Sequence, residues 1–223
     1  MEKRKQIVIL AAGDFPKHPI PLKALQEADF VVCCDSAYSK WKEESGKWET
    51  EKPFVVIGDG DSLPPCDKRQ LGDRWIHVAE QDYNDLHKAM QWATQKFNIQ
   101  HSTFLILGAT GKREDHTLGN ISYLATFAQE YPGIHLEMLT DHGRFTIQNS
   151  SFKIQNYKSF PHQQVSLFTL DPRTRVTATG LRWPLDGATL SPWWQGTLND
   201  ALSDSFQIAS DGPLLVFQTH DPK

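Results

Sequence analysis

The feature that most constrains the fold is a series of short, uninterrupted apolar runs in the first part of the chain. Four of these runs have the length and composition of buried strands, at 7–10, 30–34, 54–57 and 104–107. An unbroken apolar run is typical of a parallel strand covered on both faces, whereas a strand with one wet face alternates. Between the runs, apolar residues recur at helical spacing, at 22–28, 84–97 and 117–131. Strands that alternate with helices predict β-α-β crossovers, and hence an α/β domain built on a doubly wound, mostly parallel sheet.

The pattern changes after residue 142. Short strand candidates follow, separated by turn residues, at 145–147, 164–170, 175–179, 206–208 and 214–218. No convincing helical spacing is found in this part of the chain. Short strands punctuated by proline-containing turns are typical of an all-β sandwich. The sequence therefore predicts two domains, an α/β domain over 1–142 and a β-sandwich domain over 143–223.

Charge and cysteine content exclude several classes of protein. The chain has 223 residues, a formal net charge of −4 and a pI near 6.1, whereas a general nucleic-acid binder needs a basic face. The apolar runs are far shorter than the roughly 20 residues that cross a bilayer, and the charged N-terminal segment does not resemble a secretory signal. Three cysteines without paired spacing suit a reducing compartment. We therefore expect a cytoplasmic protein that binds neither nucleic acid nor membrane.

Glycine and aspartate gather where the predicted strands end. The first strand runs into Gly13 and Asp14, the second ends at Asp35, and the third and fourth end in the loops 58–62 and 108–116. Ligands of doubly wound sheets bind at the carboxyl ends of the strands, so we expect the four loops to converge on one crevice.

The loop 58–62 carries two carboxylates, Asp59 and Asp61, two residues apart among glycines. Mg²⁺ prefers carboxylate and phosphate oxygens, so this spacing is suited to a Mg²⁺ ion on a bound phosphate chain. The alternative is a tight turn that uses Asp and Gly for their backbone conformations.

The segment 80–88 opens a predicted helix. Asp82 is a plausible N-cap, with Asp85 in the first turn, while the spacing also allows Asp82, Asp85 and Lys88 to project toward the crevice. Taken alone, Lys88 is better explained as a solvated charge on the helix surface.

The loop 108–116 joins a strand to a helix through a Gly-rich turn. Exposed backbone N–H groups at a helix start favour phosphate, and Arg113 adds a fork of donors for phosphate oxygens. The spacing matches neither the Walker A loop nor the Rossmann fingerprint. His116 fits a capping or orienting role better than that of a catalytic base. In the β region, Trp193 and Trp194 are either core or interface residues, or a surface for stacking on a flat cationic heterocycle.

Taken in order along the chain, these motifs resemble the thiamine pyrophosphokinase family. The family pattern has an Asp at the end of the second strand, a GD-x-DS loop, a D-x-x-D-x-x-K-A helix start, and a G-x-x-G-x-R-x-D-H loop with an Asn downstream. The chain matches this pattern at Asp35, 58–62, 82–89, 108–116 and Asn120. Segments 180–185 and 196–199 are similar to signatures of the family's β domain, so the resemblance covers nearly the whole chain.

The resemblance implies ATP-dependent transfer of pyrophosphate to the hydroxyethyl oxygen of thiamine, which gives thiamine diphosphate and AMP. It implies Mg²⁺, and a homodimer with active sites at the subunit interface. With the residue chemistry above, it assigns catalytic roles to Asp35, Asp59, Asp61, Asp85 and Asp115. The expected metal ligands are Asp59, Asp61, Asp82 and Asp85. The residues expected at the ATP phosphates are Lys88, Gly108, Thr110, Gly111, Arg113 and His116. Those expected at thiamine are Gln81, Asp82, Asn120, Trp194, Thr197 and Asn199.

Three positions depart from the family pattern. Ser36 stands where a Gly is usual, Lys112 where a second Gly is common, and Leu198 where a Ser usually precedes the Asn. The proton acceptor for the alcohol is either Asp115 or Asp35.

Two other functions are compatible with the motifs. One is another Mg-dependent nucleotidyl or phosphoryl transferase on the same scaffold, with a different acceptor. The other is a non-catalytic nucleotide-binding sensor module. Several carboxylates aimed at an anionic triphosphate argue against simple binding, because they have a use only when a cation is present.

Overall fold

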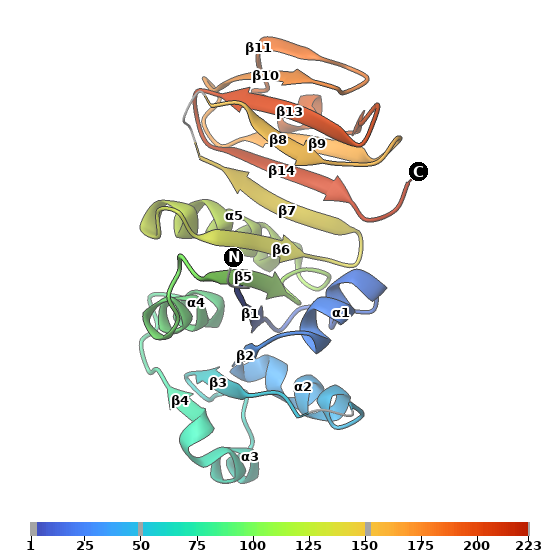
Figure 1. The fold of residues 1–223 in the computed structure, drawn as a ribbon. Helices are drawn as coiled ribbons and strands as arrows, with labels where there is room; N and C mark the ends of the chain where they lie inside the picture. Colours follow the sequence, from blue (N-terminus) through green and yellow to red (C-terminus); the bar gives the residue numbers. More distant parts are fainter. Residues whose placement is uncertain (1–3, 49–50, 150–152, 223) are drawn as a thin grey trace. The chain divides into compact units, whose positions relative to one another are not determined.

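A computed structural model describes residues 4–48, 51–149 and 153–222 of the chain. The chain divides into two compact units, Met1–Asp141 and His142–Lys223. The first unit alternates strands and helices, and the second is built from strands, so the predicted fold class is confirmed (Figure 1).

The first unit contains a parallel sheet. Its strands are β1 (Lys5–Leu10), β2 (Phe30–Cys34), β3 (Phe54–Gly58), β4 (Trp75–His77), β5 (Ser102–Leu107) and β6 (His135–Leu139). They run in the order β6-β5-β1-β2-β3-β4, and every pairing within this unit is parallel. The central strands supply fully buried residues such as Ile7, Val32 and Phe104. Their apolar runs are unbroken because helices cover both faces of the sheet.

Five helices connect these strands. They are α1 (Pro19–Gln26), α2 (Tyr38–Ser45), α3 (Pro65–Leu71), α4 (Asp85–Lys96) and α5 (Glu114–Glu130), with short 3₁₀ turns at Asp35–Ala37 and Gly72–Arg74. The chain moves outward from β1 to β4, then returns to β5 on the other side of β1. Because crossovers are right-handed, this reversal puts α1 and α2 on one face and α4 and α5 on the other (Figure 1). The order of the strands therefore reverses between β1 and β5, where such sheets bind ligands.

Several boundaries differ from the sequence predictions. Helix α1 begins at Pro19, earlier than predicted, because His18 accepts a hydrogen bond from Ile20 N–H and proline is tolerated in a first turn. Helix α4 begins at Asp85, and its N-cap is Asn84, whose side chain accepts from His87 N–H at 3.0 Å. The prediction of Asp82 as N-cap was therefore wrong.

The second unit consists of two antiparallel sheets. One has the order β12-β9-β14-β7, from Asn199–Asp200, Gln164–Thr169, Leu214–Thr219 and Gly143–Gln148. The other has the order β11-β10-β13-β8, from Leu185–Thr189, Arg175–Thr179, Ser205–Ser210 and Gln155–Lys158. Buried residues from both sheets form one core, with Leu167 and Val216 from the first and Val176 and Ile208 from the second. In the described part of this unit, the only helical element is a 3₁₀ turn at Trp193–Gly196.

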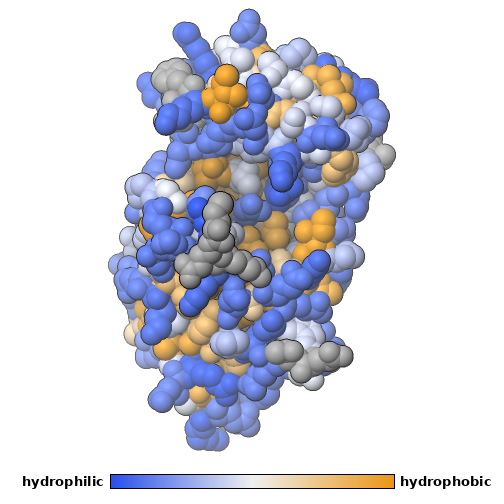
Figure 2. Space-filling model, in the orientation of Figure 1, coloured by the Kyte–Doolittle hydropathy of each residue, from blue (hydrophilic) through white to orange (hydrophobic). Residues whose placement is uncertain are grey.

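The surface in the view of Figure 2 is mostly hydrophilic, with apolar side chains scattered over it. Among the described residues, no helix combines the length and the apolarity that crossing a bilayer requires. The three cysteines are free. Burial raises the pKa of Cys33 and Cys34 well above its usual value, so both thiols stay protonated and act as small apolar core residues.

Candidate active site

A group of carboxylates lies where β2 and β3 end, and we call Asp35, Asp59 and Asp85 the acidic cluster. Asp35 follows β2 directly and is only 2% exposed. Its Oδ2 accepts a hydrogen bond from Gly60 N–H at 2.9 Å, which ties the end of β2 to the loop after β3. Desolvation, the negative charge of Asp35 and a hydrogen bond with it raise the pKa of Asp85 to about 6. The cluster thus concentrates negative charge in a partly desolvated place.

Asp59 belongs to the same cluster, but its pKa is shifted down, whereas the pKa of Asp85 is shifted up. It accepts from Asp61 N–H at 3.0 Å and from the Gln81 amide at 3.0 Å. The hydrogen bond from Asp61 N–H, followed by the one from Gln81, lowers the pKa of Asp59. The positive charge of Lys88 lowers it further. Asp59 is therefore ionised at neutral pH.

Lys88 is buried beside these carboxylates, so the interpretation as a solvated surface charge was wrong. It is only 4% exposed, and its Nζ lies 3.7 Å from Asp85 Oδ1. Helix α4 packs against β1, β2 and β3, so a side chain one turn after Asp85 points to the sheet rather than to solvent. A buried ammonium needs anionic partners, and the acidic cluster supplies them.

Asp61 and Asp82 are exposed on the two neighbouring loops. Asp82 N–H donates to the Glu80 carboxylate, which forms a turn before α4. Among the described residues, no three His, Cys, Asp or Glu side chains are arranged so that they alone would hold a metal. The donor chemistry nevertheless fits Mg²⁺, which usually takes one or two carboxylates and completes its shell with water and phosphate oxygens. The four-carboxylate set therefore stays a prediction.

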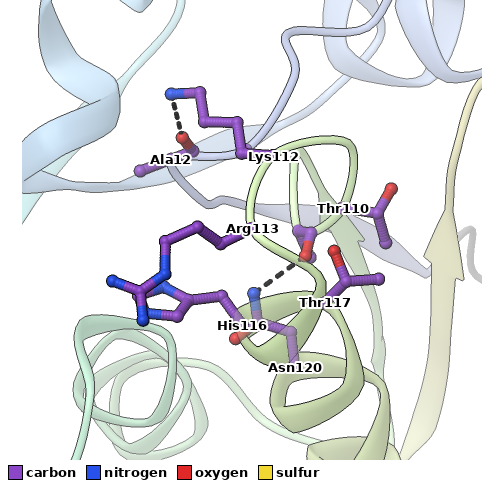
Figure 3. Close-up of a pocket in the computed structure, with 9 residues that line it drawn as sticks. Ala12, Thr110, Lys112, Arg113, His116, Thr117 and Asn120 are labelled. Atoms are coloured by element: carbon purple, nitrogen blue, oxygen red, sulfur yellow. Dashed lines mark hydrogen bonds between the residues drawn. The ribbon is translucent and has the colours of Figure 1, made fainter.

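A cavity of about 270 Å³ lies at the start of α5, and we call it the α5 cavity. Its lining includes Thr110, Arg113, His116, Thr117 and Asn120, with Ala12 and Gly13 from the loop after β1 (Figure 3). Arg113 precedes the helix, and its Nη2 pairs with Asp115 Oδ2 at 2.6 Å. This hydrogen bond with Arg113 holds the pKa of Asp115 below its usual value. His116 is exposed, and the N-cap position of α5 is Arg113, so a capping role for the His116 side chain was not found.

The loops after β1 and β5 are joined by backbone hydrogen bonds beyond the ends of the strands. Gly13 N–H donates to Gly108 O at 2.5 Å, and Asp14 N–H donates to Thr110 O at 2.8 Å. A Cβ atom on Gly13 would collide with the Thr110 carbonyl oxygen, and one on Gly108, whose φ is 63°, would lie 2.7 Å from Ala11 O. These two positions therefore require glycine.

A second cavity, of about 390 Å³, lies between the loops after β1 and β2. We call it the lysine cavity, because its lining includes Lys17, Lys40 and Lys112, together with Asp14, Phe15 and Ser36. Neither Lys17 nor Lys40 was predicted to be a site residue. Their only signal is that each follows a strand end by a few residues, which is too weak to single out a lysine.

A chain of amides connects α4 with the α5 cavity. The Asn120 side chain donates to Ala109 O at 2.8 Å, and its Oδ1 accepts from the Asn84 side chain at 3.2 Å. Asn84 in turn caps the helix that carries Asp85 and Lys88. The structure thus joins the predicted Asn120, through Asn84, to the helix that carries Asp85; Asn84 was not predicted as a site residue.

The predicted residues of the second unit lie in and next to its 3₁₀ turn. Trp193 and Trp194 are 52% and 72% exposed, so neither is a core residue. Thr197 Oγ1 donates to Trp194 O at 2.7 Å. The Asn199 side chain accepts from Trp183 N–H at 3.1 Å and donates to Trp183 O at 2.7 Å, so it holds the backbone of that tryptophan.

Comparisons with known proteins match both units. The family model "Thiamin pyrophosphokinase, catalytic domain" matches residues 22–136, and "Thiamin pyrophosphokinase, substrate-binding domain" matches residues 143–217. A thiamine pyrophosphokinase from Oryza sativa subsp. japonica is 30% identical over 177 residues, which are 74% of this chain and 65% of that protein. One from Bacillus subtilis is 29% identical over 62% of this chain and 64% of that protein. The chain thus covers less than two thirds of the length of either relative.

Solved structures show the same fold. The structure of thiamin pyrophosphokinase from Candida albicans aligns with a TM-score of 0.82 at 15% identity, covering 97% of this chain and 90% of that one. The thiamine pyrophosphokinase from Bacillus subtilis aligns with a TM-score of 0.77 at 21% identity, covering 97% of this chain and all of that one.

Proposed function

The chain belongs to the thiamin pyrophosphokinase family, and on that premise we propose that it transfers the pyrophosphoryl group of ATP to the hydroxyethyl oxygen of thiamine. The products are thiamine diphosphate and AMP. The observation that carries this proposal is the arrangement of the acidic cluster and the α5 cavity at the edge of one parallel sheet. An acidic group suited to a divalent cation lies near a helix start suited to phosphate.

We assign the metal to the carboxylates. Asp59, Asp61, Asp82 and Asp85 would hold Mg²⁺, with phosphate oxygens and water as the remaining ligands. Burial, together with the negative charge of Asp35 and a hydrogen bond with it, raises the pKa of Asp85 to about 6, and a divalent cation would relieve this crowding of negative charge. Mg²⁺ bound there would neutralise charge on the phosphate chain.

The chain's own groups bind and align the phosphates. Arg113 presents a planar fork of donors beside the α5 cavity, and Gly108, Thr110 and Gly111 offer backbone N–H groups on the same loop. His116 lines that cavity, and Lys88 supplies a positive charge beside Asp85. Because pyrophosphoryl transfer depends mainly on alignment and charge neutralisation, these contacts would account for most of the rate enhancement.

The thiamine hydroxyl proton needs an acceptor, and we assign it to Asp35 rather than Asp115. Asp115 is committed to Arg113 at 2.6 Å, and its pKa is lowered, which makes it a weak base. Asp35 is buried in the acidic cluster, next to the loop that carries Asp59 and Asp61. Asp115 would then serve to orient Arg113.

We further propose that thiamine is held by Gln81, Asp82 and Asn120 of the first unit and by Trp194, Thr197 and Asn199 of the second. Asn199 would act by holding the loop at Trp183 in place, because its side-chain amide is hydrogen-bonded to the backbone N–H and carbonyl of Trp183. The exposed indole of Trp194 suits the face of a flat cation. We place the protein in the cytoplasm, because its free thiols fit a reducing compartment.

We propose a homodimer in which each active site combines the first unit of one protomer with the second unit of its partner. The test mixes two inactive variants, Asp61→Asn and Trp194→Ala, and refolds them together. Random pairing makes about half of the dimers mixed, and in a mixed dimer one site carries both defects and the other carries neither. Recovery toward roughly a quarter of wild-type activity supports the shared site. Absence of recovery, with mixed dimers verified by mass spectrometry, refutes it.

One assay tests the activity itself. Protein is incubated with ATP, Mg²⁺ and thiamine, and the products are separated. We expect AMP and thiamine diphosphate in equal amounts. ADP with thiamine monophosphate would show a simple kinase, and binding of ATP without any product would favour a nucleotide-binding sensor.

A further inference from the structure

Asn84 lies between the start of α4 and helix α5, and its side-chain amide has a partner on each side. Its Oδ1 accepts a hydrogen bond from His87 N–H at 3.0 Å, which caps α4. Its Nδ2 donates to Asn120 Oδ1 on α5 at 3.2 Å. One amide group thus serves both as the cap of one helix and as a link to the next.

The link continues to the backbone at the α5 cavity. Asn120 lines that cavity, and its Nδ2 donates to Ala109 O at 2.8 Å (Figure 3). Ala109 is buried and directly precedes Thr110, in the loop that carries Arg113. Two side-chain amides therefore connect the start of α4 with the loop that forms the α5 cavity, and we call this connection the amide link.

Other contacts around Asn84 hold the same two helices together. Burial raises the pKa of Tyr123, one turn after Asn120 on α5, and a hydrogen bond with the Asn84 backbone opposes that rise. The buried ring of His87 packs against Tyr123 and Phe127, with ring centroids 5.6 Å apart in both pairs. The start of α4 is thus fixed to α5 by polar and by aromatic contacts.

The two regions that the amide link joins have different parts in the proposed reaction. The first turn of α4 carries Asp85 and Lys88, and Lys88 N–H donates to Asn84 O at 3.2 Å. The loop before α5 carries Arg113, beside the α5 cavity. Transfer requires both sets of groups at a fixed spacing, because a displacement of about 1 Å can lower a rate about a hundredfold.

We propose that Asn84 is a positioning residue, which holds the acidic cluster and the α5 cavity at the spacing that pyrophosphoryl transfer requires. This inference rests on the proposed function. Asn84 acts through Asp85 on one side and through Asn120 on the other, rather than on the substrates. Loss of the amide link should therefore lower kcat and leave the KM values for ATP and thiamine nearly unchanged.

Two variants separate the link from the cap. Asn84→Ser keeps the cap, because serine caps helices about as well as asparagine, but its hydroxyl is too short to reach Asn120. Asn84→Ala removes both interactions. Asn98→Ser is the matched control, since Asn98 is exposed beyond the other end of α4 and also accepts from a backbone N–H, that of Gln100, at 2.9 Å.

Thermal melts and steady-state rates of thiamine diphosphate formation are measured for each variant. We expect Asn84→Ser to keep the melting temperature within about 1 °C of the wild type and to lose about tenfold in kcat. Asn84→Ala should lose a similar factor in kcat and also melt a few degrees lower, because it lacks the cap. Asn98→Ser should change neither quantity.

A double variant tests whether the two amides act as one unit. Asn84→Ser added to Asn120→Ala should lower kcat no further than Asn120→Ala alone, because the link is already broken. Normal kcat in Asn84→Ser with a reduced kcat in Asn84→Ala would show that Asn84 is only a cap, and would overturn the inference. Full additivity in the double variant would overturn it as well.

Calorimetry with inorganic pyrophosphate supplies a measurement that needs no turnover. Pyrophosphate is titrated with and without Mg²⁺, and the gain in affinity from Mg²⁺ reports how well the acidic cluster and the α5 cavity act together. We expect Asn84→Ser to reduce that gain about fivefold and to leave the Mg²⁺-free affinity unchanged. An undiminished gain overturns the inference. Product formation by the wild type is scored separately: normal products without these effects refute only this inference, and the calorimetric effect without products refutes only the proposed function.

Discussion

The acidic cluster and the α5 cavity lie at the same edge of one sheet, but they are built in opposite ways. In and beside the acidic cluster, charged groups are removed from water: Asp35 is 2% exposed and the neighbouring Lys88 is 4% exposed, while Asp59 and Asp85 are half-buried. At the α5 cavity the charged groups are on the surface, and Arg113 and Asp115 keep 72% and 62% of their side chains exposed. In the acidic cluster, burial and the repulsion between carboxylates determine the electrostatics. At the α5 cavity, the exposed ion pair between Arg113 and Asp115 determines them.

This difference implies that the two regions respond to different kinds of mutation. A change of charge in the acidic cluster alters a partly desolvated network, so even an isosteric substitution has a large effect. At the α5 cavity water screens the charges, and what matters is the geometry that Arg113 presents to a ligand. The following experiments test that contrast, beginning with the largest expected effect.

Asp85→Asn should reduce the rate of thiamine diphosphate formation about a thousandfold, which corresponds to about 4 kcal/mol of transition-state stabilisation. The amide keeps the shape of the side chain but removes the negative charge needed to hold Mg²⁺. Steady-state assays of product formation measure the loss. Asp73→Asn is the control, since Asp73 is exposed and is not one of the assigned site residues. Retention of more than a tenth of the activity by Asp85→Asn would remove this residue from the catalytic group.

Arg113→Lys should raise the KM for ATP about tenfold and leave the KM for thiamine nearly unchanged. Lysine keeps the positive charge but lacks the planar fork that contacts two phosphate oxygens at once. Initial rates over a grid of ATP and thiamine concentrations separate the two constants. If both constants stay at wild-type values, geometry at the α5 cavity is unimportant, and the contrast with the acidic cluster fails.

The stability of the metal-free protein should fall as the pH rises from about 4 to 6. In the folded protein the pKa of Asp85 is about 6, above its ordinary value of 3.8, so the folded state holds the proton more tightly than the unfolded chain. The full shift would be worth about 3 kcal/mol, and the partial exposure of Asp85 reduces this to about 1 kcal/mol. Urea unfolding at pH 4 and pH 7, with and without Mg²⁺, measures the change.

Asp85→Asn should abolish most of this pH dependence and be more stable than the wild type at pH 7 without metal. The variant that loses the most activity is thus expected to gain stability. If the difference in stability between wild type and Asp85→Asn does not change over the same pH range, Asp85 does not hold its proton more tightly in the folded protein, which contradicts its burial beside Asp35.

Asp115→Asn should change the melting temperature by less than about 1 °C, because an exposed ion pair contributes little to stability. The pair with Arg113 is short, at 2.6 Å, but both side chains are largely in water. Differential scanning fluorimetry at low and high salt checks this. A shift of several degrees would show that the α5 cavity depends on buried charge as the acidic cluster does.

Much of the first unit follows from its sequence, because its central strands are covered on both faces and therefore appear as unbroken apolar runs. The predicted strand 30–34 is β2, and the predicted strand 104–107 lies within β5. Helix α2 was not predicted, since only Tyr38 and Trp41 of its eight residues are buried and the rest are polar. Strand β4 has three residues, too few to show any period.

For the candidate site too, the sequence predicts where the backbone places residues better than it predicts which way their side chains point. The strand-end loops identified Asp35 and Asp59, because backbone topology alone brings parallel strand ends together. Sequence did not reveal that Lys88 is buried, since that depends on how α4 rotates against the sheet. The sequence also suggested Asp82 as the helix cap, whereas the cap is Asn84; both side chains are able to cap, and only the path of the loop decides between them.

The hydrogen bonds of Gly13 and Asp14 have a consequence for how the protein opens. Loops usually exchange their amide protons quickly, because they unfold locally at little cost. These two amides continue the hydrogen bonding between the chains of β1 and β5 beyond the strand ends, although in a shifted register, so their exchange should require separation of the two central strands. The segment that borders both cavities would then be protected like the core of the sheet, and proteases would cut the chain elsewhere first.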